Sequence, residues 1–246
     1  MHARVFTYRP VFRFLVLVFS ILALVPISVG CDYPRDPRGT LQAVRNDTMR
    51  VGIVDNGPWT RMEDGRASGI EVELLEDFAA KLGAETSFVP GTTPELLEAA
   101  KEGEVDVLVG GFTSTSPGVS EGKEAGVTGT YLITRTVVGV PPGLAAFDDP
   151  SGREVAVESI DTTAAMLKAE GAVPVPVDDL SSTGMPVAAY PWQLEAWGFE
   201  PTGVELPEEK HVMAVPLGEN GWLVELERFL RENRAEAKAM LREETT

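Results

Sequence analysis

Apolar segments of strand length alternate with segments of helical periodicity between residues 49 and 111. The strand-length segments are residues 49–54, 86–89 and 105–111. Residues 70–82 carry apolar side chains at helical spacing and are followed by Gly83, a common helix stop. Thr93-Pro94, read as an N-cap and a first helical proline, begins a second helix that runs to Lys101. This order predicts a βαβαβ unit whose parallel sheet is covered by helices on both faces.

A second block of strands and helices follows from residue 136. Its strand candidates are residues 136–142, 154–158, 172–177, 185–190 and 211–215. One helix is expected at residues 162–169, and a short one begins at Pro191. A long final helix, with Asn220 as its N-cap, is expected to reach Leu241. The chain is therefore predicted to hold two small α/β units without a flexible linker between them.

The first 30 residues have the pattern of a secretory signal. Three arginines precede an apolar run over residues 14–30, which contains Pro26 and is at the lower limit for a membrane span. Cys31 follows directly, as in a bacterial lipoprotein cleavage site. We expect a lipoprotein signal peptide at residues 1–30, lipidation at Cys31 and a tether at residues 31–46; an uncleaved anchor and plain secretion are the alternatives. Each places the remaining chain outside the cytoplasm, and lipidation would anchor it to the cell membrane.

The composition excludes several classes of function. The chain has 38 acidic and 21 basic side chains and a net charge of −17, so it repels phosphate backbones and nucleic-acid binding is excluded. One cysteine permits neither an internal disulfide nor a cysteine-based metal site. Two histidines in the whole chain are few for a histidine-rich metal site or a Ser-His-Asp triad. These counts leave little for a metal site or a catalytic triad, and we assign no metal, no cofactor and no catalytic residue.

Two loops at the carboxyl ends of the first block's strands are the candidate binding site. In open α/β sheets, ligands bind in the crevice beyond these ends. Residues 55–59 supply the indole of Trp59, and residues 110–115 supply glycines and three hydroxyl groups. A core position for Trp59 and an ordinary polar turn at residues 110–115 are the alternatives.

Residues 49–91 are similar to the opening of bacterial extracellular solute-binding proteins of family 3, the polar amino-acid receptors of ABC importers. The shared features are a strand, a turn with an aromatic residue, and GIEVELL at the start of a helix. ELLEAAKEGEVDVLVGG, residues 128–140 and HVMAVPLGEN resemble later parts of these proteins in the same order. The resemblance covers roughly residues 47–235.

The resemblance implies an α/β protein with the two-lobed type II fold of periplasmic binding proteins. Such a protein closes on a small-molecule ligand, delivers it to a membrane permease complex and is a monomer. Lobe one would comprise residues 47–131 plus 213–246, and a shortened lobe two residues 132–212. The ligand-binding residues would be Trp59, Gly111, Thr113, Thr115, Thr162, Thr163 and Tyr190.

The resemblance leads us to expect a binding protein that is not an enzyme. A lipid-anchored sensor or orphan binder without a transport role is one alternative. A dehydratase-like enzyme on the same fold, with Asp55 and Glu158 as candidate acids, is another.

Two groups that hold amino acids in this family are missing here. Family members place an arginine for the α-carboxylate shortly after the glycine-threonine loop, but no basic residue follows residue 111 before Lys123. Tyr190 stands near the position of the aspartate that binds the α-amine. Arg61 and Arg135 are the candidate replacement cations, and Thr162 and Thr163 at a helix N-terminus suit an anionic group. We therefore expect weak binding of free α-amino acids.

Overall fold

The computed structural model describes residues 35–158 and 162–245. Residues Pro34–Thr246 form one compact unit. The expected signal peptide and the expected lipidation at Cys31 lie outside the described residues. Within the described part of the chain, every helix is too short or too polar to cross a membrane.

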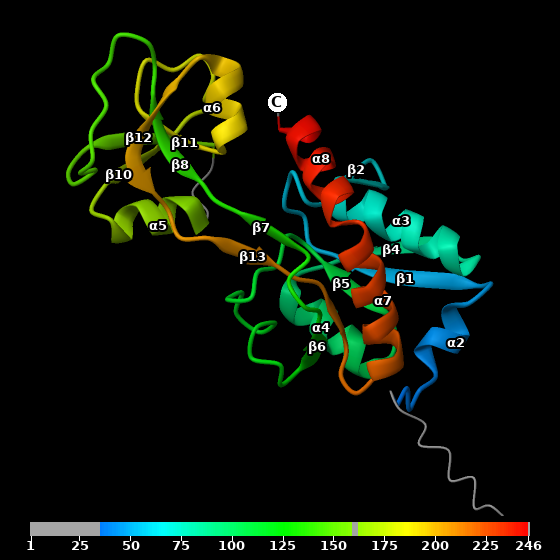
Figure 1. Ribbon diagram of the computed structural model, residues 1–246. Coiled ribbons are helices and arrows are strands. Elements are labelled where there is room, and N and C mark those ends of the chain that lie inside the picture. The colour runs from blue at the N-terminus through cyan, green and yellow to red at the C-terminus, as the bar shows by residue number, and fades with distance from the viewer. Residues whose placement is uncertain (1–34, 159–161, 246) are drawn as a thin grey trace, which may run out of the picture. The chain divides into compact units, whose positions relative to one another are not determined.

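The first sheet has five strands in the order β4-β1-β5-β14-β6 (Figure 1). The predicted βαβαβ unit forms its parallel part, because β1 pairs in parallel with both β4 and β5. The last two strands come from later in the chain, and β14 is antiparallel to both of its neighbours. The strands are β1 (Thr48–Ile53), β4 (Glu85–Pro90), β5 (Val107–Val109), β6 (Ala125–Val127) and β14 (Ala214–Pro216).

Helices cover this sheet with apolar faces. The helix α3 (Ile70–Leu82) has the predicted bounds, buries Leu75 and Phe78, and ends at Gly83 with the positive φ of 70° that favours glycine. The largest fully buried side chain is Trp222 of α7 (Asn220–Glu232), whose ring centroid lies 5.3 Å from that of Phe78. The other helices of this sheet are α2 (Thr40–Val44), α4 (Thr93–Glu102), α7 (Asn220–Glu232) and α8 (Arg234–Glu244).

The second sheet also has five strands, in the order β10-β9-β11-β8-β12. The strands β10, β9 and β11 are parallel, whereas β8 is antiparallel to β11 and β12. Two helices pack on the sheet through the buried side chains of Leu167 and Leu194. The elements are β8 (Val137–Val140), β9 (Glu154–Val157), α5 (Thr162–Ala169), β10 (Val173–Pro176), β11 (Val187–Ala189), α6 (Pro191–Trp197) and β12 (Glu200–Glu205).

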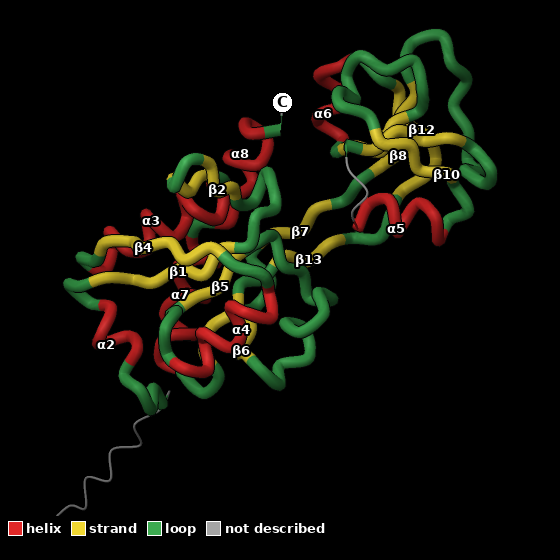
Figure 2. The backbone as a smooth tube through the Cα atoms, turned by 180° about the vertical axis from the view of Figure 1, so that it is seen from behind, coloured by secondary structure: helices red, strands yellow, loops and turns green. Residues whose placement is uncertain are grey.

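Two short antiparallel strands run side by side between the sheets. They are β7 (Leu132–Thr134) and β13 (Glu209–His211), and both views of the backbone show them together (Figures 1 and 2). His211 pairs with Leu132, and Glu209 pairs with Thr134. A hairpin of β2 (Arg61–Glu63) and β3 (Arg66–Ser68) follows β1 in the chain.

Several element boundaries differ from the sequence predictions. Residues 211–215 do not form one strand, because β13 ends at His211 and β14 begins at Ala214, and the two strands belong to different sheets. The long final helix is two helices that meet at Asn233, whose Nδ2 donates to the carbonyl of Phe229 at 2.8 Å. The α7 N-cap is Glu219 rather than Asn220, and the α4 N-cap is Thr92 rather than Thr93.

The segment before β1, which was expected to be a tether, contains the helix α2 and is bonded to the first sheet's helices. Its anchor is Glu219, which is buried and accepts from the backbone of Arg38 at 3.0 Å and from Thr40 Oγ1 at 2.9 Å. The contact joins residues about 180 positions apart, so no local pattern in the sequence indicates it.

Candidate functional site

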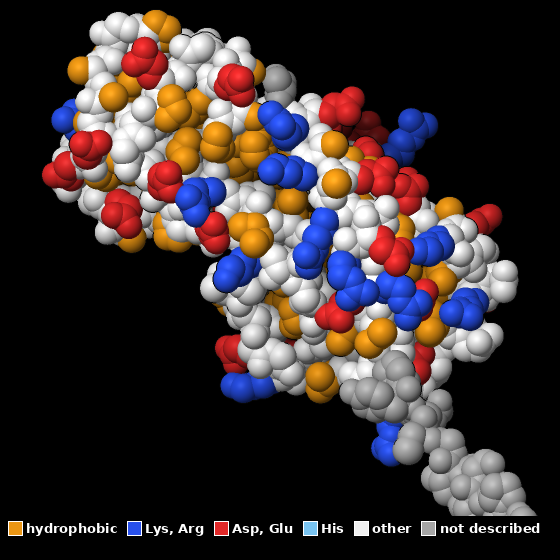
Figure 3. Space-filling view, viewed as in Figure 1, with side chains coloured by type: hydrophobic (Ala, Val, Ile, Leu, Met, Phe, Trp, Pro, Cys, Tyr) orange, Lys and Arg blue, Asp and Glu red, His pale blue; other side chains and the backbone are white. Residues whose placement is uncertain are grey.

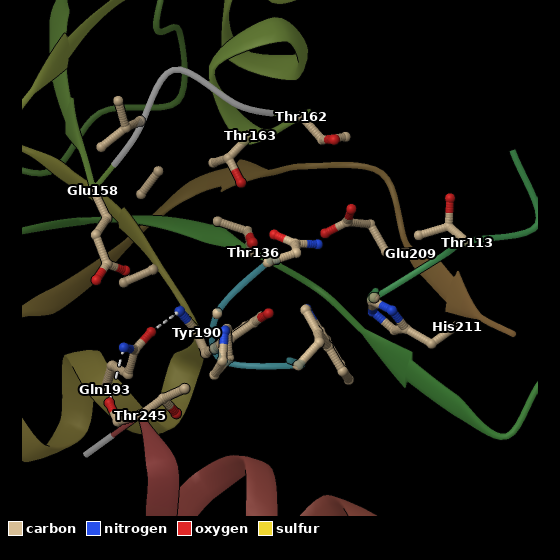
Figure 4. A pocket seen from close by; sticks show the side chains of 18 of the residues that line it. Thr113, Thr136, Glu158, Thr162, Thr163, Tyr190, Gln193, Glu209, His211 and Thr245 are labelled. Atoms are coloured by element: carbon tan, nitrogen blue, oxygen red, sulfur yellow. Dashed lines mark hydrogen bonds between the residues drawn. The ribbon is translucent and has the colours of Figure 1, made fainter. Parts of the chain in front are cut away.

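A cavity of about 230 Å³ is lined by residues from both sheets and from β13 (Figure 4). It lies at the carboxyl ends of β1 and β5 in the first sheet and of β9 and β11 in the second, as ligand sites do in open α/β sheets. Its volume is below the range of drug-sized sites, so it suits a small solute. Six residues named from the sequence line it: Trp59, Gly111, Thr113, Thr162, Thr163 and Tyr190.

The seventh residue, Thr115, is not among the lining residues. Its hydroxyl lies 3.0 Å from that of Thr113, and its backbone N–H donates to Thr113 Oγ1 at 3.3 Å. Asp55, a candidate acid, is exposed and does not line the cavity, whereas Glu158 does. The assignment of these residues to ligand binding stays a prediction.

Glu71 holds the glycine loop that follows β5. It lies in the first turn of α3, is completely buried, and its Oε2 accepts from the backbone N–H groups of Gly110 and Gly111, each at 2.8 Å. Its Oε1 accepts from the hydroxyl of Tyr131 at 2.7 Å. Burial raises the pKa of Glu71 above its ordinary value, although these three hydrogen bonds act in the opposite direction. The sequence analysis did not identify this residue, although the GIEVELL segment contains it.

The two loops of the first sheet are joined directly. Asn56 Nδ2 donates to the carbonyl of Gly110 at 2.8 Å. Gly111 has a φ of 65°, and a Cβ at this position would overlap the indole of Trp59 and lie 2.7 Å from Asn56 Nδ2. Only glycine therefore permits this close approach of the loop to the aromatic ring.

Trp59 belongs to the core and to the cavity wall at once. Its exposed fraction is 5%, and it packs with the apolar side chains of the first sheet. Its ring stacks on that of His211 with the centroids 3.9 Å apart. The two interpretations of this tryptophan from the sequence therefore do not exclude each other.

His211 lies in β13 and was not predicted as a site residue. It is buried, and its Nε2 lies 2.9 Å from Thr134 Oγ1, while its Nδ1 has no hydrogen-bond partner among the described residues. Burial lowers the pKa of His211 from 6.5 to about 4. The ring is therefore neutral at pH 7, and it contributes no positive charge to the cavity.

Acidification from pH 7 to pH 4 is expected to destabilise the protein through His211 by about 3 kcal/mol. The unfolded chain takes up a proton near pH 6.5 and the folded chain only near pH 4, so stability is lost as the pH falls through this window. Urea unfolding at several pH values measures the effect. A His211→Gln variant, which does not titrate here, should show a shallower pH dependence between these values; an equal slope in both proteins would contradict the prediction.

The second sheet's side of the cavity is connected to the C-terminal helix. Gln193 Oε1 accepts from the backbone of Tyr190 at 2.9 Å, and its Nε2 donates to the carbonyl of Thr245 at 2.9 Å (Figure 4). The Tyr190 ring stacks on that of Trp192, with the centroids 4.6 Å apart. Trp192 itself does not line the cavity, and its Nε1 donates to Thr245 Oγ1 at 3.0 Å.

The candidate replacement cations both pair with acids outside the cavity. Arg135 is exposed and lies 2.6 Å from both Glu205 and Glu208. Arg61 lies 3.3 Å from Glu244 and lines a neighbouring hollow. The exposed basic residues of α7 and α8 lie on the outer surface, where Figure 3 shows a band of Lys and Arg side chains over these helices. Among the described residues, no three His, Cys, Asp or Glu side chains are grouped as a metal site would require.

Two α/β sheets joined by paired strands, with a polar cavity lined from both, define a solute-binding protein of the two-lobed periplasmic type. The chain belongs to the bacterial extracellular solute-binding proteins, family 3, since the model of this family matches residues 49–237. The predicted fold class and the resemblance noted in the sequence are thereby confirmed, and the family name indicates a location outside the cytoplasm.

Solved structures show the same fold at low sequence identity. An ancestral cationic amino acid solute-binding protein superposes with a TM-score of 0.62 and 18% identity, over 84% of this chain and all of the other. The L-cystine solute receptor of Neisseria gonorrhoeae, in its unliganded open conformation, superposes with a TM-score of 0.57 and 20% identity, over 80% and 91% of the two chains.

Curated relatives correct one expectation, that the chain is not an enzyme. A membrane-bound lytic murein transglycosylase F of Maricaulis maris is 36% identical over 105 residues, which are 40% of this chain and 23% of that protein. The protein of the same name from Vibrio cholerae is 30% identical over 112 residues, which are 45% and 20% of the two chains. The chain thus spans less than a quarter of the length of these relatives, which are enzymes by name. The expectation that this chain has no enzymatic role is therefore wrong. The expectation was based on the resemblance to binding proteins, which does not reveal that enzymes also contain such a segment.

Proposed function

We propose that this protein captures a small polar solute in the cavity between its two sheets and delivers it to a membrane importer of the ABC type. The observation that carries the proposal is the cavity itself, which takes polar side chains from the ends of strands in both sheets. The first sheet's side is preorganised, because Glu71 and Asn56 hold the loop at Gly110. The proposal places the protein outside the cytoplasm as a monomer, attached to the membrane through a lipid on Cys31.

Binding is expected to bring the two sheets together around the solute. Only β7 and β13 run between them as paired strands in the described chain, and such short crossing segments are typical hinges. A solute that contacts both sides favours the closed state and therefore shifts the population toward it. Isothermal titration calorimetry over a panel of amines, amino acids, organic acids and sugars, followed by small-angle X-ray scattering, tests the proposal.

We expect the radius of gyration to fall as the cavity is saturated. Bovine serum albumin, with the same solute added, controls for solvent effects on the scattering. If a tightly bound ligand leaves the radius of gyration unchanged, the two sheets do not close around it. If no compound of the panel binds, the proposal of solute capture itself fails.

The transglycosylase relatives support a second candidate, action on murein. The chain shares a segment with them, and the cavity contains the carboxylates of Glu158 and Glu209. Carboxylic acids are the usual groups for cleavage of glycosidic bonds. Incubation of the purified chain with isolated murein tests this candidate: release of soluble fragments that Glu209→Gln abolishes would support it, and intact murein would reject it.

A further inference from the structure

We infer that the cavity selects a small organic cation, an aliphatic amine or guanidine, that carries no carboxylate. The inference rests on the proposed function and narrows the ligand to one chemical class. It depends on three observations: the charge of the lining side chains, the way in which the loop N–H groups are occupied, and the aromatic surface inside the cavity.

The described lining residues include two acidic side chains and no Lys or Arg, and the one histidine, His211, is neutral at pH 7. Glu209 is half-buried on β13, and Glu158 is exposed at the end of β9. In Figure 4 the Glu209 side chain points toward the middle of the drawn residues, while Glu158 extends toward Gln193. A carboxylate in a partly dehydrated cavity attracts a cation more strongly than it would in water, and it repels a ligand carboxylate.

The neighbouring hollow extends this acidic surface. It shares Glu158 with the cavity and adds Asp178 and Asp179, together with Glu244, which pairs with Arg61. Acidic groups next to a cavity raise the local concentration of cations and speed their association.

Four backbone N–H groups of the loop that follows β5 already have hydrogen-bond acceptors within the protein. Those of Gly110 and Gly111 donate to Glu71. Within the loop, Thr113 N–H donates to Ser116 Oγ at 2.8 Å, and Ser114 N–H donates to the carbonyl of Lys210 at 2.8 Å. A ligand carboxylate would therefore find no free donor among these four N–H groups, and the nearby Arg61 is already paired with Glu244.

The remaining wall is suited to a cation with an apolar stem. Trp59 and Tyr190 contribute aromatic surface, which attracts ammonium and guanidinium groups and also contacts methylene carbons. Hydroxyl groups of Thr113 and Thr136 can accept hydrogen bonds from an amine.

Pairs of compounds that differ by one carboxylate provide the test. Agmatine is arginine without its α-carboxylate, and 1,5-diaminopentane is lysine without it. In calorimetric titrations of the purified chain, we expect agmatine to bind more tightly than L-arginine by about tenfold or more, and 1,5-diaminopentane to exceed L-lysine likewise. Affinity for the amines should fall as sodium chloride is raised, because salt screens the attraction.

Two isosteric variants test whether the carboxylates of the cavity attract the amine. Glu209→Gln should weaken agmatine binding by about tenfold, and Glu158→Gln by about threefold because this side chain is more exposed. Glu85→Gln is the matched control: Glu85 is exposed at the start of β4, does not line the cavity, and should leave binding unchanged. Thermal unfolding of each variant establishes that it is folded, and Glu158→Gln carries the test if Glu209→Gln does not fold.

Each other result has a definite meaning. If the start of α5, at Thr162 and Thr163, held a ligand carboxylate, L-arginine would bind as tightly as agmatine or more tightly, and the inference would be overturned. Binding of succinate or glucose, but not of the amines, would also overturn it while leaving solute capture intact. If none of these compounds and no other solute in the panel bound, both proposals would fail.

Discussion

Glu71→Ala is expected to lower the free energy of unfolding by about 3–5 kcal/mol. The substitution removes the acceptor of two buried N–H groups, those of Gly110 and Gly111, and of the Tyr131 hydroxyl. Each buried donor left without a partner costs about 1–3 kcal/mol, and the alanine also leaves a void. Urea unfolding followed by circular dichroism measures the loss.

Tyr131→Phe is the matched control for this loss. It removes one of the three hydrogen bonds to Glu71 and leaves the glycine loop bonded, so we expect a cost of about 1–2 kcal/mol. Glu71→Gln keeps the shape and one acceptor oxygen and should be less destabilising than the alanine variant. Equal stabilities of the Glu71→Ala and Tyr131→Phe proteins would contradict the role of Glu71 as the organiser of the loop.

The raised pKa of Glu71 gives its contribution a definite pH dependence. Because burial makes the folded chain hold this proton to a higher pH than the unfolded chain does, the stability from this group is present at low pH and is lost as the pH rises through the folded pKa. Glu71 therefore does not cause unfolding in acid, and the loss of stability expected below pH 6.5 is assigned to His211.

Trp59→Ala is expected to lower the free energy of unfolding by about 3–5 kcal/mol and to weaken ligand binding by about tenfold or more. The indole is 5% exposed and fills the space between the glycine loop and His211, so its removal leaves a large void. It also removes an aromatic wall of the cavity. Urea unfolding and calorimetric titration with the ligand found in the solute panel measure the two effects.

Two variants separate the core contribution of Trp59 from its contribution to the site. Phe78→Ala should cost a similar free energy of unfolding, since Phe78 is fully buried, but it should leave affinity unchanged because Phe78 does not line the cavity. Trp59→Phe keeps an aromatic ring and should retain part of both effects. If Trp59→Ala bound the ligand as the unmodified protein does, Trp59 would be a core residue only.

Local patterns in the sequence were sufficient for the elements that depend on local interactions. The apolar spacing of residues 70–82 and the glycine after them predicted α3 with the bounds observed, and residues 162–169 predicted α5. The order of strands and helices predicted the parallel part of the first sheet, and the order of short motifs indicated the family. Helix periodicity, capping and the short apolar runs of strands are properties of neighbouring residues, which is why the sequence alone indicates them.

Six of the seven binding residues named from the sequence line the cavity, but only the tertiary structure showed what supports them and which other residues join them. Glu71 bonds a loop 39 and 40 positions away, and His211 stacks on Trp59 from the opposite end of the chain. The break at Asn233 and the division of residues 211–215 between two sheets depend on which strands and helices are packed nearby, as do the partners of Arg61 and Arg135. The sequence by itself was enough to indicate the family and the first βαβαβ unit. It also showed that no arginine closely follows the glycine loop. The charge and the hydrogen-bond state of the cavity followed from long-range contacts, because burial and partner choice are set by segments that meet only when the chain is folded.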